Sequence, residues 1–350
     1  MTGVSETSSP VPLPAFTSLP DLASRALAGS VIAASDELFA QRENLIKPEP
    51  SVFSPHEFGH KGKVYDGWET RRRRDDQRHE TGDWAVVRLG VPGVVHGVVV
   101  DTAWFTGNYP THISVEGLRV DGYPPVDELI GRDWTALVAR SPALGDTANP
   151  YAVEDREVWT HLRLTIYPDG GVARFRVHGR PTPDPRFLTG TIDLAALENG
   201  GRLVGCSDAF YSSPAKLILP GRAQLMGDGW ENARRRDDGN DFAVFALAGE
   251  GAIEHVELDT SYFVGNAPGW MRLQACRVDP SGANRDPDLA TLGQLEWWDV
   301  VARQQALPDT RHRYLVDSDR PATHVRLDVY PDGGLARMRV HGRLTGNRDT

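Results

Sequence analysis

The chain contains very little cysteine, because only Cys206 and Cys276 occur in 350 residues and they lie far apart in the sequence. Two such cysteines exclude a disulfide scaffold, and no Cys-x-x-Cys pair or zinc-type Cys/His spacing is present. No run approaches the roughly 18 apolar residues of a membrane span, and residues 1–20 lack the apolar core of a signal segment. These absences predict a cytoplasmic protein that does not cross a membrane.

Positive charge is also scarce. The chain has 38 Lys and Arg residues against 48 Asp and Glu residues, which gives a net charge of -10 at pH 7. Binding to a phosphate backbone needs a positive face, so we expect neither nucleic acid nor an anionic membrane as a partner. A local arginine cluster can still hold a small anion. The P-loop, the Gly-x-Gly-x-x-Gly fingerprint, His-Glu-x-x-His and the Gly-x-Ser-x-Gly elbow are all missing, so nucleotide hydrolysis, hydride transfer and serine esterase activity have no support.

The chain does contain a long internal repeat. DGWETRRRRDD from Asp66 matches DGWENARRRDD from Asp228, and DTAWFTGNYP from Asp101 matches DTSYFVGNAP from Asp259. HLRLTIYPDGGVARFRVHGR and HVRLDVYPDGGLARMRVHGR then follow in the same order. Self-similarity of this kind indicates a tandem duplication. We predict a flexible segment over 1–20, a first repeat over 21–180, a proline-rich linker over 181–192, a second repeat over 193–343 and a tail over 344–350.

The residue patterns within each repeat favour β-structure. WAVVRLGVPGVVHGVVVDT has β-branched runs interrupted by Pro92-Gly93, which predicts two strands and a turn. ARFRVHG and ARMRVHG alternate apolar and basic residues, as a half-buried strand does, and each follows an Asp-Gly-Gly turn that tolerates positive φ. Helical patterns are confined to 22–27, 126–130 and 297–303. Many short strands with Gly and Pro turns predict an all-β fold with one β-sandwich per repeat.

The first candidate site is the DGWE segment with the arginines that follow it, present in both repeats. Arginine pairs bidentately with carboxylates, and a neighbouring Glu can move protons. The alternative is a solvated loop in which the arginines pair with Asp75, Asp76, Asp237 and Asp238. The repeats differ just after this segment, where Thr70 in the first corresponds to Asn232 in the second.

Two further candidates follow along the chain. Gly-Asn-x-Pro, at Asn108 and Asn266, is a turn whose Asn and preceding Asp can point polar groups into a cleft, although most such turns only connect strands. His178 and His341 stand at strand ends and are acid or base candidates, although such a histidine is more often packed. The sequence leaves open which copy carries a site.

Together these motifs resemble the allantoicase (allantoate amidinohydrolase) family. The resemblance rests on DGWETRRRR, DWAVVRLG, VDTAWFTGNYP, GDGWENARRR and DTSYFVGN, and it extends from about Asp21 to Arg343. It implies two tandem jelly-roll, galactose-binding-like β-sandwich repeats. The implied reaction is hydrolysis of allantoate, a small anion with two ureido arms, to ureidoglycolate and urea in purine degradation. The family also implies a homo-oligomer.

On this resemblance we assign roles to both copies. An arginine would hold the substrate carboxylate, an asparagine amide would bind a ureido group, and a carboxylate or histidine would move the protons. A divalent metal is compatible with carboxylates in such loops, but no ligand set demands one and its ligands are unknown. The competing interpretation is a non-catalytic tandem sandwich that binds a glycan or another small ligand. The catalytic candidates are Glu69, Glu231, His178 and His341, and the substrate-binding candidates are Asp66, Trp68, Arg72, Arg73, Asn108, Asp228, Trp230, Arg234, Arg235 and Asn266.

Overall fold

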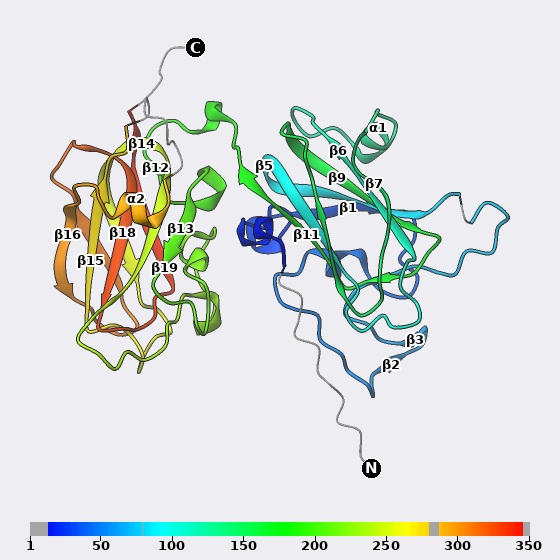
Figure 1. Ribbon diagram of the computed structural model, residues 1–350, viewed down its shortest axis with the longest axis horizontal. Helices are drawn as coiled ribbons and strands as arrows, with labels where there is room; N and C mark the ends of the chain where they lie inside the picture. The colour runs from blue at the N-terminus through cyan, green and yellow to red at the C-terminus, as the bar shows by residue number, and fades with distance from the viewer. Residues whose placement is uncertain (1–12, 79, 280–286, 346–350) are drawn as a thin grey trace. The chain divides into compact units, whose positions relative to one another are not determined.

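The computed structural model describes residues 13–78, 80–279 and 287–345. The chain divides into two compact units, Met1–Arg180 and Pro181–Thr350. Strands predominate in both units, and the helical pieces are short (Figure 1). Each unit contains one of the two sequence repeats.

The first unit is built around one long strand, β5. The described elements of this unit are η1 (Ala15–Ser18), η2 (Arg25–Leu27), β1 (Ser30–Ala34), η3 (Arg42–Ile46), β2 (Phe58–Gly59), β3 (Gly62–Lys63), β4 (Trp68–Glu69), β5 (Asp83–Asp101), β6 (His112–Leu118), α1 (Val126–Ile130), β7 (Thr135–Pro142), β8 (Ala148–Ala152), β9 (Val158–Tyr167), β10 (Gly171–Val172) and β11 (Arg174–Pro181).

Strand β5 belongs to both layers of the first sandwich. Its first half pairs with β1 and β9 in the order β1-β5-β9-β6-β7, and its second half pairs with β8 and β11. The register with β9 shifts between Arg88 and Gly93. The predicted turn at Pro92-Gly93 is therefore wrong, because the chain continues as one strand of 19 residues. A proline has no N–H to donate and is tolerated at such an irregularity.

The second unit repeats this topology around strand β14. The described elements are η4 (Pro185–Phe187), β12 (Ile192–Asp193), η5 (Leu197–Asn199), β13 (Arg202–Cys206), η6 (Pro214–Ile218), η7 (Met226–Asp228), β14 (Asp241–Asp259), β15 (Trp270–Cys276), α2 (Leu289–Leu292), β16 (Trp298–Gln305), β17 (Arg311–Leu315), β18 (Pro321–Tyr330) and β19 (Arg337–Leu344). The first half of β14 pairs with β13 and β18, and the second half pairs with β17 and β19.

The hydrophobic cores use equivalent positions of the two repeats. On β9, the alternate residues Leu162, Leu164 and Ile166 are fully buried, and on β18 Val325, Leu327 and Val329 are fully buried in the same way. Alternate side chains of a strand face the same side, so these residues line the inner face of each sandwich. Burial of one such side chain contributes about 1.5–3 kcal/mol relative to exposure. The predicted all-β fold of two tandem sandwiches is confirmed.

Helices are few, as the sequence indicates, but one prediction is wrong. The short helix expected at Val126–Ile130 is α1, whereas the segment 297–303 lies largely in strand β16. The β-branched pair Val300-Val301 favours a strand, and Val301 pairs with Leu273 of β15. None of the helices in the described residues has the length and apolar character needed to cross a membrane.

Candidate active site

The DGWE segment of each repeat lies against the Asp-Gly-Gly turn of the same unit. In the first unit, β4 pairs with β10, and Glu69 is opposite Gly171. The Thr70 hydroxyl accepts a hydrogen bond of 3.2 Å from the backbone N–H of Gly170, whose φ is +137°. In the second unit, Asn232 Oδ1 accepts from the N–H of Gly333 at 2.8 Å. The exchange of Thr for Asn therefore preserves the hydrogen bond that fixes this turn.

The turn packs tightly against the core, which gives a first prediction. A Cβ added at Gly171 would lie 2.0 Å from the fully buried Phe105 ring, whereas a Cβ at Gly107 would meet nothing within 4 Å. We expect Gly171→Ala to lower the free energy of unfolding by about 1–3 kcal/mol, the usual cost of overpacking. Gly107→Ala, the control, should change it by less than about 0.5 kcal/mol. Urea unfolding of the two variants measures the difference, and equal stabilities would contradict the packing.

A glutamate and an asparagine meet in each unit. Asn108 Nδ2 donates a hydrogen bond of 2.7 Å to Glu69 Oε1, and Asn266 Nδ2 donates one of 2.7 Å to Glu231 Oε1. The backbone carbonyl of Asn108 also accepts from the N–H of Gly171 at 2.7 Å, which joins this loop to the turn. The structure thus brings together two predicted site residues that are about 40 positions apart in the first repeat, and it does so again in the second.

The Glu69 carboxyl is only partly exposed, and burial raises its pKa. The hydrogen bond from Asn108 and the positive charge of Arg72 act in the opposite direction but do not cancel the effect of burial. Arg72 and its counterpart Arg234 are exposed, and neither forms an ion pair with another described residue. In the first unit the charge of Arg72 thus acts on the Glu69 carboxyl, and in both units an exposed arginine follows the glutamate by three positions.

The next arginine in each loop has internal partners instead. The backbone N–H of Arg73 donates to Asp169 at 2.7 Å, and its guanidinium lies 3.8 Å from Asp83. Arg235 donates from Nη1 to Asp241 at 2.9 Å. Within the loops, Arg73 also pairs with Asp75 at 3.2 Å and Arg235 with Asp237 at 3.0 Å, as the alternative of arginines paired within their own loop predicts. The substrate-binding role predicted for these two arginines has no support from these contacts, because carboxylates of the same unit engage both guanidinium groups.

The two tryptophans of the DGWE segments are core residues. Trp68 and Trp230 are fully buried, and their indole N–H groups donate to the carbonyls of Asp36 at 2.8 Å and Asp208 at 3.0 Å. A side chain with no exposed surface cannot form the wall of a ligand site. The substrate-binding role predicted for Trp68 and Trp230 therefore has no support from their positions, and both are buried anchors that hold the DGWE segment to the sandwich.

The first aspartates of the two segments differ between the units. Asp66 accepts hydrogen bonds from Arg174 at 2.6 Å and Lys47 at 2.9 Å, and these outweigh burial and lower its pKa to about 2. Asp228 accepts instead from the backbone N–H of Gln224 at 2.8 Å. Asp66 is thus held as an ion-paired carboxylate, and we assign neither aspartate to direct substrate contact.

The predicted histidines lie away from the glutamates. His178 follows Val172, the partner of Trp68, by six positions, which corresponds to up to about 20 Å along a strand. Its Nδ1 is 2.8 Å from the carbonyl oxygen of Leu19, and its ring packs near Phe16. His178 is thus the packed alternative that the sequence left open.

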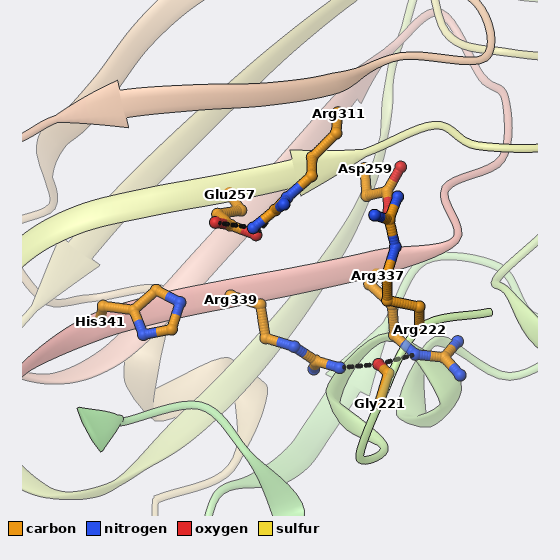
Figure 2. Close-up of a pocket in the computed structure, with 8 residues that line it drawn as sticks. All are labelled: Gly221, Arg222, Glu257, Asp259, Arg311, Arg337, Arg339 and His341. Atoms are coloured by element: carbon orange, nitrogen blue, oxygen red, sulfur yellow. Dashed lines mark hydrogen bonds and ion pairs between the residues drawn. The ribbon is translucent and has the colours of Figure 1, made fainter.

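His341, the counterpart of His178, lines a cavity of about 270 Å³ in the second unit (Figure 2). Its ring stacks on His255 with centroids 4.3 Å apart, and burial lowers its pKa. Asp259, at the start of the predicted Gly-Asn turn, also lines this cavity. The complete lining is Gly221, Arg222, Glu257, Asp259, Arg311, Arg337, Arg339 and His341.

Most of these lining residues were missed by sequence reasoning. Arg337 and Arg339 belong to the alternating ARMRVHG strand, and their spacing alone indicated one exposed face. Glu257 and Arg311 are on β14 and β17, which pair only in the folded chain. One feature of the sequence points to this cavity, namely a difference between the repeats: Val99 in the first corresponds to the charged Glu257 in the second.

A metal ion has no ready ligand set in the part of the chain that the structure describes. No group of three or more His, Cys, Asp and Glu side chains there is arranged to hold one. We therefore derive no step through a metal.

Comparison with known proteins places this geometry in a family. The family model described as "Allantoicase: Allantoicase repeat" matches residues 20–182 and again residues 192–345. The chain belongs to the allantoicase family. A probable allantoicase of Nocardia farcinica (strain IFM 10152) is 53% identical over 334 residues, which cover 95% of this chain and 96% of the relative. An allantoicase of Dictyostelium discoideum is 39% identical over 338 residues, which cover 94% and 88% of the two chains.

Solved allantoicase structures agree with the fold. The crystal structure of the Saccharomyces cerevisiae allantoicase is 33% identical, and its match has a TM-score of 0.77 over 93% of this chain and 96% of that one. A second allantoicase structure has a TM-score of 0.76 and covers 91% and 92% of the two chains. The allantoicase resemblance predicted from the DGWE and Gly-Asn segments is thus confirmed.

Proposed function

We propose that the chain hydrolyses allantoate to ureidoglycolate and urea. The observation that carries this conclusion is the match of two allantoicase repeats over almost the whole chain, with allantoicases at 39–53% identity. The site chemistry suits the reaction, because allantoate is a small anion and each unit brings a carboxyl and an amide together, with an exposed arginine three positions beyond the carboxyl.

The reaction replaces a C–N bond of the central carbon by a C–O bond. The oxygen of water bonds to that carbon, one water proton leaves, and the departing urea nitrogen gains a proton. In our proposal Glu69 or Glu231 accepts the water proton or supplies the proton to the leaving nitrogen. Only Oε1 of each Glu takes the asparagine hydrogen bond, so Oε2 remains for water. The raised pKa of Glu69 favours such a proton transfer nearer neutrality.

Substrate binding is assigned to the exposed arginine and the asparagine of each loop. Arg72 or Arg234 pairs with the substrate carboxylate, and Asn108 or Asn266 binds a ureido group through its amide. His341 remains a second acid or base candidate, because it lines a cavity, whereas the packing of His178 supports a structural role.

The competing function, a sandwich that only binds a glycan or another ligand, is not favoured. The curated relatives that span this chain are named allantoicases. The free thiols of Cys206 and Cys276 support the cytoplasm as the compartment. Assembly into a homo-oligomer stays a prediction.

The test is to incubate the purified full chain with allantoate and to follow urea and ureidoglycolate over time, with and without prior chelation. We expect the two products in equal amounts. A fall in rate after chelation, restored by a divalent cation, would show that a metal takes part. No product from the folded protein, with metal restored, would contradict hydrolysis of this substrate.

A further inference from the structure

The cavity of the second unit carries an excess of positive charge. Four arginines line it, together with the carboxylates of Glu257 and Asp259, so two positive charges remain when His341 is neutral. Burial would raise the pKa of Glu257, but the hydrogen bonds and charge of Arg311 hold it below its ordinary value, so this carboxylate is ionised. Figure 2 shows Glu257 and Arg311 joined at one side of the cavity and Arg339 extended toward Gly221 at the other.

The first unit has counterparts of only some residues that line this cavity. Asp101 of β5 pairs with Ala148 at the position where Asp259 of β14 pairs with Arg311. Val99 likewise stands where the second unit has Glu257. Arg337 and Arg339 have counterparts in the first unit, Arg174 and Arg176. The ion pair of Glu257 with Arg311 at the cavity wall has no such counterpart and belongs to the second repeat.

One arginine in the cavity keeps a free donor group. In the first unit, Arg174 Nη2 donates to the carboxylate of Asp66 at 2.6 Å. In the second unit, the carboxylate of Asp228 faces the N–H of Gln224 instead. The counterpart Arg337 is 93% buried and donates from Nε and Nη1 to backbone carbonyls, while its Nη2 has no hydrogen bond within the described residues. Although the residue as a whole is buried, Nη2 is not among the enclosed side-chain atoms that lack a partner, so it retains a donor that water or a ligand in the cavity can reach.

We propose that this cavity binds a small organic carboxylate, through Arg337 Nη2, the exposed Arg222 and Nη1 of Arg311, the nitrogen that its pair with Glu257 does not use. A carboxylate matches the planar guanidinium fork, and its single charge suits the excess better than a phosphate dianion flanked by Glu257 and Asp259. The substrate and product of the proposed function belong to this class, so naming them as the ligand rests on that function. The cavity is then a second carboxylate site, separate from the one assigned to Arg72 or Arg234, and its preference for a carboxylate does not depend on hydrolysis.

The probe is N-carbamoylglycine, which has a carboxylate and one ureido arm but lacks the second ureido group that hydrolysis would release. We would titrate it into the full chain by calorimetry, with N-carbamoylglycinamide as the neutral match and inorganic phosphate as the competing anion. We expect the carboxylate to bind at least about tenfold more tightly than the amide, because the charge-assisted hydrogen bonds are lost with the charge.

The variants change exposed arginine side chains. Arg222 and Arg311 line the cavity and their side chains are 63% and 42% exposed. Arg313, 64% exposed, reaches Glu257 at 3.3 Å from the same strand as Arg311 but does not line the cavity. We expect Arg222→Gln and Arg311→Gln each to weaken binding by about tenfold, and Arg313→Gln to change it by no more than about twofold.

Two outcomes overturn the proposal. Unchanged binding in Arg222→Gln and Arg311→Gln, with a loss in Arg72→Gln or Arg234→Gln, would place the carboxylate in the DGWE loops. Phosphate binding as tight as that of the carboxylate would assign the cavity to a different ligand class. Failure of the hydrolysis assay is separate from both, because a chain that releases no urea can still bind N-carbamoylglycine in an arginine-dependent way.

Discussion

The double variant Glu69→Gln, Glu231→Gln is expected to hydrolyse allantoate about 10²- to 10⁴-fold more slowly than the wild type, the usual contribution of general acid–base catalysis. Glutamine keeps the shape of the side chain and an oxygen that accepts the hydrogen bond from Asn108 or Asn266. It removes the group that takes up and releases a proton. The loss should therefore appear in kcat at saturating allantoate, while urea unfolding should show little change in stability.

The matched control is Asp76→Asn, Asp238→Asn, which neutralises two exposed carboxylates in the same loops. This control should retain wild-type turnover. The single variants Glu69→Gln and Glu231→Gln then identify the repeat that carries catalysis, because only the variant in that repeat should show the loss of turnover. Full turnover in the double variant would remove both glutamates from the mechanism.

The pH dependence offers a second measurement on the same group. If Glu69 acts as the base, the deprotonated form is active, and activity should fall as the pH drops through its pKa. Burial raises that pKa, so the acid limb should lie above the range of an ordinary glutamate. The limb should be absent from the residual rate of Glu69→Gln.

The duplication made much of the fold predictable. Because the motifs occur twice in the same order, one repeat can be aligned with the other. The alternating apolar residues of 161–167 and 324–330 then indicate the same half-buried strand in both repeats. At Pro92-Gly93 the sequence predicts a turn, because a local break in the strand pattern resembles one. Pairing of the long strand with partners in both layers overrides it.

The site was only partly predictable, for a physical reason. Glu69 and Asn108 were each chosen for their chemistry, but sequence does not state which loops meet. The Trp of the DGWE segment suits substrate contact when taken alone, but a large aromatic beside a turn is as well suited to anchor it, and in both units it is fully buried. The arginine cavity combines residues from four distant segments, each of which looks like an ordinary strand or loop when taken alone.

A buried histidine in each repeat is expected to make both units sensitive to mild acid. His161 on β9 and His324 on β18 occupy equivalent positions and are each 4% exposed. Each Nδ1 is 2.9 Å from the hydroxyl of the preceding threonine, and Nε2 of His324 is buried without a partner among the described residues. Burial, followed by the charge of a nearby arginine, lowers the pKa of each from 6.5 to about 4.

The direction in which stability changes with pH depends on which state, folded or unfolded, binds the proton more readily. The unfolded chain protonates these histidines below about pH 6.5, whereas the folded chain does so only below about pH 4. Their contribution to stability is therefore complete above pH 6.5, declines as the pH falls from 6.5 to 4, and changes no further below 4. Each histidine should account for a loss of about 3 kcal/mol over this window.

Urea unfolding between pH 4 and pH 7 measures this loss in the wild type and in His161→Asn and His324→Asn. Asparagine can keep the hydrogen bond to the threonine hydroxyl and does not titrate, so each variant should lose less stability on acidification by about 3 kcal/mol. Comparing each variant with the wild type at the same pH separates the contribution of the histidine from that of other groups. Burial raises the pKa of Glu198, for example, but this carboxyl contributes equally to the stability of the variant and of the wild type. The control is His56→Asn, which changes an exposed histidine and should lose as much stability on acidification as the wild type does. Parallel curves for all four proteins would show that the buried imidazoles take up protons as readily in the folded chain as in the unfolded one.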